Sequence, residues 1–154
     1  MNNKLIVEPQ RLVMPTVKVR RLGYFCGLAE ILGRESVPHS ILISRFVQWA
    51  KNNQGNLEKY CKDLPIERIT RVKTTGGINS PEAARRYINV ARELGFVVRL
   101  FRQWQNSKTG NVLRVLPKEE NPFNLSLAQI YFLLKTILKA DYDYLRIIYD
   151  LFMI

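Results

Sequence analysis

Apolar and polar positions along this chain divide it into segments with helical spacing, one segment with strand-like composition, and polar connections. Apolar residues recur every three or four positions in residues 17–33, 40–54 and 80–94, the period of a helix with one buried face. Residues 57–64 and 65–73 carry shorter runs of the same kind, and the later one is preferred as the second helix, between 40–54 and 80–94. The pattern predicts a mostly helical core.

The segment 80–94 has the clearest helix boundaries. Ser80 can accept an unpaired N–H of the first turn, Pro81 lacks the N–H that would be unbonded there, and Gly95 provides a stop. The residues predicted to face the core are Ala84, Tyr87, Ile88, Ala91 and Leu94. The opposite face carries Arg85, Arg86, Asn89 and Arg92.

A β-hairpin is predicted directly after this helix. Residues 96–105 and 112–116 are rich in β-branched and aromatic side chains, and they flank a polar segment, residues 106–111, that resembles a turn. Its basic residues are Arg99 and Arg102 on the outgoing strand, Lys108 at the tip and Arg114 on the return. The hairpin is therefore expected to present positive charge.

The C-terminal part is predicted to be a helical hairpin. After a linker at 117–122, Ser126 and Gln129 form a capping-box pattern, so a helix should run from Leu127 to about residue 139, with a second one to the chain end. This segment has more apolar residues than one buried stripe on each helix would need. They would cap the core, form a homodimer or assembly interface, or precede further chain. Membrane insertion is not expected, because the longest uncharged run is shorter than about twenty residues.

Charge is the strongest compositional feature. The chain has a formal net charge of +11, and residues 68–118 hold 11 basic against 2 acidic residues, whereas residues 121–154 hold 3 of each. Such an excess is most simply explained by an anionic partner, either nucleic acid or an acidic membrane. The charge coincides with the predicted helix and hairpin.

Candidate chemistry is sparse. Neither GxxxxGK[ST] nor GxGxxG occurs, Cys26 and Cys61 lack a metal-ligand spacing, and His39 has no nearby nucleophile or acid and is assigned a local surface role. The acidic residues have the positions of surface or capping groups. We expect no enzyme activity, no metal and no cofactor. With no secretory signal in residues 1–15, which are predicted to be an arm, a cytoplasmic protein with reduced thiols is expected.

The chain resembles the winged helix-turn-helix superfamily roughly over residues 38–117. The resemblance lies in the order of elements: a basic helix, the segment Glu93-Leu94-Gly95-Phe96-Val97, a strand, a basic turn and a second strand. The resemblance implies an α+β fold, a three-helix core with a β-hairpin wing over residues 16–117, to which the helical hairpin at 121–154 is appended. It also implies double-stranded DNA as the partner, with the helix in the major groove and the wing along the backbone or in the minor groove.

The resemblance also assigns residue roles. The helix residues that would face the major groove are Arg85, Arg86, Asn89 and Arg92. The wing contacts would be Arg99, Arg102, Lys108 and Arg114. The phosphate contacts before the helix would be Lys73, Thr74 and Thr75.

Other interpretations stay open. A polar helix face can simply be solvated, and winged helices also serve as protein-interaction scaffolds inside larger complexes. RNA binding is permitted by the charge, although no RNP1-like or GXXG pattern supports it. The process that would use DNA binding is also open: transcription regulation, replication, a mobile element, and restriction or defence would all need the same surface.

Overall fold

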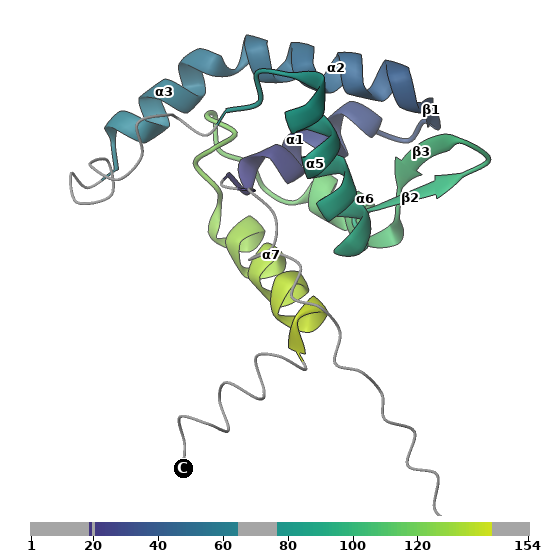
Figure 1. The fold of residues 1–154 in the computed structure, drawn as a ribbon. Helices are drawn as coiled ribbons and strands as arrows, with labels where there is room; N and C mark the ends of the chain where they lie inside the picture. The colour runs from purple at the N-terminus through teal and green to yellow at the C-terminus, as the bar shows by residue number, and fades with distance from the viewer. Residues whose placement is uncertain (1–18, 20, 65–76, 143–154) are drawn as a thin grey trace, which may run out of the picture.

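Three helices pack around a fourth that is buried on nearly all sides (Figure 1). The structure, a computed structural model, describes residue 19 and residues 21–64 and 77–142. These residues form six helices and a three-stranded antiparallel sheet, so the chain is α+β and mostly helical. The helices are α1 (Gly23–Leu32), α2 (His39–Asn52), α3 (Gln54–Lys62), α5 (Pro81–Glu93), α6 (Lys108–Val115) and α7 (Leu127–Ala140). The strands are β1 (Val37–Pro38), β2 (Val97–Leu100) and β3 (Gln103–Asn106).

Helix α1 lies at the centre of the core, and its two glycines, Gly23 and Gly27, allow neighbouring segments to pack closely against it. A Cβ on Gly27 would lie 2.5 Å from the ring of Trp49 in α2, and one on Gly23 would lie 2.7 Å from the Pro122 carbonyl oxygen. Glycine at these positions therefore allows α2 and the segment before α7 to pack directly on the α1 backbone. Tyr24 is fully buried among aromatic rings, and its hydroxyl accepts the Ile78 N–H at 2.9 Å.

The sheet joins parts of the chain that are distant in sequence. Its strand order is β1-β3-β2, with Val37 opposite Trp104 and Leu100 opposite Gln103. Strand β1 is only two residues long and has no period of its own, so the sequence pattern did not predict it. It matters because α2 begins at the next residue, which fixes the start of α2 beside the hairpin.

The predicted helix boundaries are confirmed where the sequence carries caps. Ser80 Oγ accepts the Ala83 N–H at 3.2 Å, α5 ends at Glu93, and Gly95 has a φ of +79°. The capping box of Ser126 and Gln129 is present at the start of α7. The five residues predicted to face the core from α5 are all buried.

Other boundaries differ from the prediction. Helix α1 starts at Gly23, and the helix predicted over 40–54 is divided at Asn53, after which α3 continues through Gly55. Gly55 therefore does not end a helix. The predicted arm, the preferred second helix at 65–73 and the last helix of the chain lie wholly or almost wholly outside the described residues.

The hairpin prediction was wrong in its register. The turn is formed by Phe101 and Arg102, both with positive φ, and not by residues 106–111. The polar segment 106–111 instead begins α6, because Ser107 Oγ accepts the Gly110 N–H at 3.0 Å as a helix cap. Turn-type residues thus mark a strand-to-helix junction here.

Candidate nucleic-acid interface

Helix α5 presents a polar face to solvent. Arg85, Arg86, Asn89 and Arg92 are all exposed, whereas the side chains on the opposite face are buried against α1 and α2. No large apolar side chain is exposed on α5, all of whose residues the structure describes. The outward face can therefore offer hydrogen-bond donors and positive charge, together with the carbonyl acceptor of Asn89.

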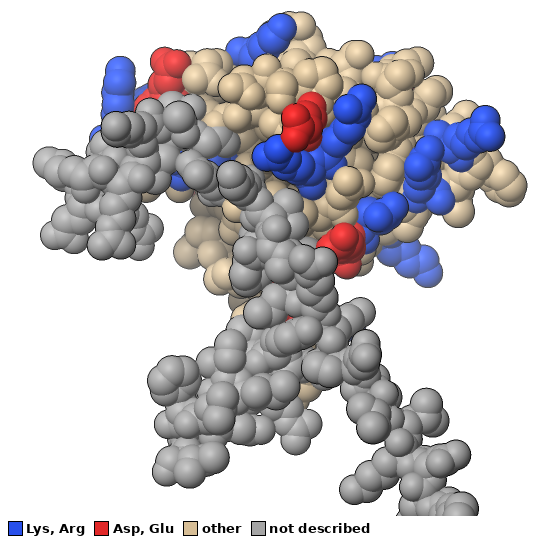
Figure 2. Space-filling model, in the orientation of Figure 1, with Lys and Arg blue, Asp and Glu red and all other residues tan. Residues whose placement is uncertain are grey.

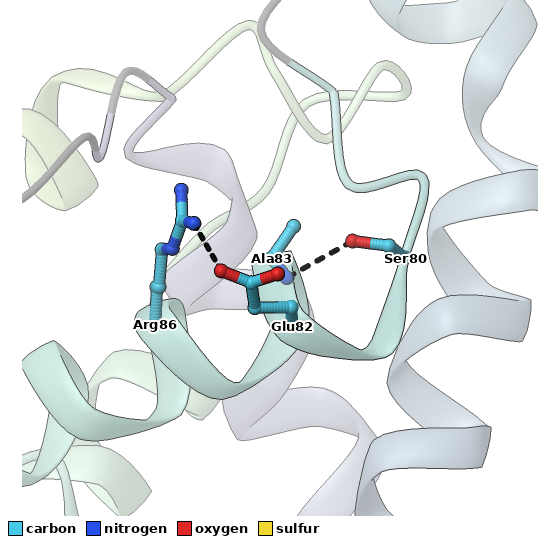
Figure 3. Close-up of polar contacts among 4 residues, drawn as sticks. All are labelled: Ser80, Glu82, Ala83 and Arg86. Atoms are coloured by element: carbon cyan, nitrogen blue, oxygen red, sulfur yellow. Dashed lines mark hydrogen bonds and ion pairs between the residues drawn. The ribbon is translucent and has the colours of Figure 1, made fainter.

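One arginine of this face already has an acidic partner. Arg86 pairs with Glu82, one turn before it and close to the Ser80 cap (Figure 3). The carboxylate lies in the first turn of α5, where the helix dipole favours it. Among the described residues, no acidic side chain lies within ion-pair distance of Arg85 or Arg92. These two have more charge to offer a ligand than Arg86 does.

The hairpin carries the next two cationic groups. Arg99 on β2 and Arg102 in the turn are exposed, and the Arg99 guanidinium lies 5.7 Å from the centre of the Trp104 ring on β3. Figure 2 shows basic side chains on the face formed by α5 and the β2–β3 hairpin, extending to the hairpin at the right of the view. The helix and the hairpin thus present positive charge on one side of the molecule.

His39, the first residue of α2, contacts the β2–β3 hairpin. Its Nδ1 accepts the Trp104 indole N–H at 2.9 Å, so the imidazole is neutral in this arrangement. Partial burial lowers the pKa of His39 below 6.5, and the positive charges of Arg99 and Arg85 lower this pKa further. The Trp104 ring that donates to His39 also lies under the Arg99 guanidinium, so the imidazole lies beside the cationic hairpin.

His39 is the part of this surface that the sequence interpretation missed. It was assigned a local surface role, but it is half-buried against a strand 65 residues away. Its contact depends on the pairing of Val37 with Trp104, and no local pattern in the sequence encodes that pairing.

Two of the predicted wing contacts do not lie on the β2–β3 hairpin. Lys108 is exposed in the first turn of α6, and Arg114 is half-buried in its last turn, where its Nε is buried and has no hydrogen-bond partner. Helix α6 packs against α1 and β3. Gly110 also allows the α6 backbone to approach the Phe96 carbonyl oxygen just before β2, since a Cβ there would lie 2.1 Å from that oxygen. The assignment of Lys108 and Arg114 to the hairpin is corrected accordingly.

The remaining predicted contacts, Lys73, Thr74 and Thr75, lie outside the described residues. Within the residues that the structure describes, no group of three or more His, Cys, Asp or Glu side chains is placed to hold a metal ion. Across the same residues, no helix is both long and apolar enough to cross a membrane. Cys26 and Cys61 do not form a disulfide bond with each other.

Comparisons with known proteins give no match: no family model, curated protein or solved structure is similar to this chain.

Proposed function

We propose that this protein binds double-stranded DNA through α5 and the β2–β3 hairpin, in the manner of a winged helix-turn-helix. The observation that carries the proposal is that the polar face of α5 and the basic hairpin lie on the same side of the molecule, with β2 packed against α5 (Figure 2). The order of elements is compatible: α1, α2 and α5 pack together, and the hairpin follows α5 directly. The protein would act as a transcriptional regulator or as the DNA-recognition module of a larger assembly.

The chemistry divides the surface into two functions. Arginine can bond guanine through two N–H groups, and asparagine can bond adenine, so Arg85, Asn89 and Arg92 suit base edges in a major groove. Arg102 in the hairpin turn suits phosphate, which supplies affinity without reading sequence. Arg86 is expected to contribute less, because Glu82 must first release it.

Binding of labelled duplexes at several salt concentrations tests this division. Arg85→Ala and Asn89→Ala should change the ranking of DNA sequences recovered in an unbiased selection. Arg102→Ala should weaken binding to every duplex alike and reduce the slope of log affinity against log salt by about one. Lys135→Ala removes a positive charge from α7, away from this surface, and is the matched control.

Two results would contradict the proposal. If Lys135→Ala weakens binding as much as Arg102→Ala does, the attraction is a property of net charge and not of this face. If an RNA duplex of the same sequence competes as well as DNA, α5 does not enter a major groove, because the A-form groove is too narrow to admit it.

A second candidate, a protein contact within a larger assembly, is favoured by α7. Its exposed apolar side chains recur at helical spacing along one side: Leu127, Tyr131, Leu134 and Leu138. Helix α7 is well separated from the β2–β3 hairpin (Figure 1). A homodimer or assembly contact on α7 is thus compatible with DNA binding by α5, and it would be the sole function if no duplex binds.

A further inference from the structure

The tip of the β2–β3 hairpin has an unusual turn. Leu100 and Gln103 are the last paired residues, so Phe101 and Arg102 alone reverse the chain. Their φ angles are 47° and 66°, in the left-handed region. Two-residue turns of this kind normally use Asn-Gly or Gly-Gly, because a bulky side chain is disfavoured at positive φ.

Phe101 is placed at the tip at a cost to folding and solubility. Its side chain is 100% exposed, and its neighbour Leu100 is 52% exposed. An exposed phenylalanine gains nothing from burial, and its backbone conformation is one that aromatic residues rarely adopt. Because it packs on no part of the described structure, its placement points to a contact with another molecule.

The surroundings of Phe101 narrow the chemistry of that molecule. Arg102 is adjacent in the turn and Arg99 lies two residues before Phe101, so a fully exposed apolar ring has two exposed arginines next to it in the hairpin. A fitting partner has negative charge outside and flat apolar surfaces within reach, as nucleic acid does through its phosphates and bases. An acidic bilayer has a related arrangement, but the outward face of α5 beside it carries Asn89 and arginines and exposes no large apolar group.

We propose that Phe101 acts as an aromatic wedge, which stacks on or inserts between bases when the α5–hairpin face docks on DNA. This inference depends on the proposed function and adds a local opening of the base stack to it. Arg99 and Arg102 would hold the flanking phosphates while the ring enters from the groove beneath the hairpin. Apolar wedges of this kind unstack a base step and kink the duplex.

The experiment compares a fluorescein-labelled, mixed-sequence duplex two helical turns long with the same duplex carrying a central bulge of unpaired bases. A bulge lowers the cost of unstacking, so wild-type protein should bind the bulged duplex at least about fivefold more tightly. Phe101→Ala should abolish this preference. Arg102→Ala should keep it while reducing the salt slope.

A matched control is Leu127→Ala, which removes another strongly exposed apolar side chain, from α7. It should keep the preference for the bulge. Phe101 is fully exposed, so Phe101→Ala should leave the thermal midpoint at or above that of wild type, and a folding defect would be visible in that measurement.

The outcomes separate the two proposals. If wild-type protein binds neither duplex, the proposed function fails and the wedge with it. If it binds DNA but Phe101→Ala keeps the full preference for the bulge, the wedge alone is overturned. If Phe101→Ala leaves DNA binding intact but prevents binding to phosphatidylserine-containing vesicles, the tip is assigned to a bilayer instead.

Discussion

At the scale of single residues, His39 is the most informative side chain of the chain. It is the only histidine, so its imidazole resonances can be followed without interference. Its ring accepts a hydrogen bond from Trp104 and lies in the positive field of Arg85 and Arg99. The folded protein therefore resists protonation at this position, because a proton on Nδ1 would break the hydrogen bond and add a third positive charge.

This arrangement predicts a pH-dependent stability. Because the folded-state pKa is lowered, the contribution of His39 to stability is present above the ordinary value of 6.5 and is lost as the pH falls through the folded-state pKa. Urea unfolding midpoints should fall between about pH 7 and about pH 5 more steeply for wild type than for His39→Asn, whose amide oxygen can still accept from Trp104. Equal pH dependence in both proteins would contradict this.

At the scale of elements, the sequence predicted a helix correctly where its ends carry chemical signals, as in α5 and α7. It failed where structure depends on distant pairing. Phe101-Arg102 is not a turn dipeptide by composition, whereas Asn-Ser-Lys-Thr-Gly-Asn is, so the hairpin was placed too late and α6 was missed. The α5 surface residues were identified because helix periodicity is local; the contact with His39 was not, because β1 pairing is not local.

The junction between β3 and α6 predicts an unequal effect of two serine caps. Ser80 caps α5 with one hydrogen bond, and its replacement by alanine should cost about 1 kcal/mol. Ser107 caps α6 and also donates its hydroxyl proton to a carbonyl at the end of α5, that of Gly95 or Phe96. Ser107→Ala should therefore cost about 2 kcal/mol, measured by chemical denaturation. A smaller loss than for Ser80→Ala would show that the junction does not depend on this hydroxyl.

At the scale of the whole molecule, DNA binding at the charged face, as proposed, would be coupled to protonation of His39. Burial lowers the pKa of His39 most, and the positive charges of Arg99 and Arg85 lower it further; phosphates placed near these arginines would offset their contribution, so the pKa should rise on binding DNA. The complex then holds a proton that the free protein lacks, and affinity should increase as the pH falls through this interval. Titration of the His39 ring by NMR, with and without duplex, measures the shift directly. An unchanged pKa in a saturated complex would place the DNA on another face.

The enclosed position of α1 limits how far the α5–hairpin face could change shape on binding DNA. Helix α1 packs against α2, α5 and α6. Its two glycines allow Trp49 and Pro122 to lie directly on its backbone, so the elements around α1 have little room to shift. The backbone amides of α1 should be the slowest to exchange with deuterium. Helix α5 should also be rigid, because its Tyr87 ring packs against the ring of Tyr24 in α1. Beyond the base contacts proposed for Arg85 and Asn89, part of the selectivity would then come from the deformability of the DNA, because the DNA would have to adapt to a rigid protein surface.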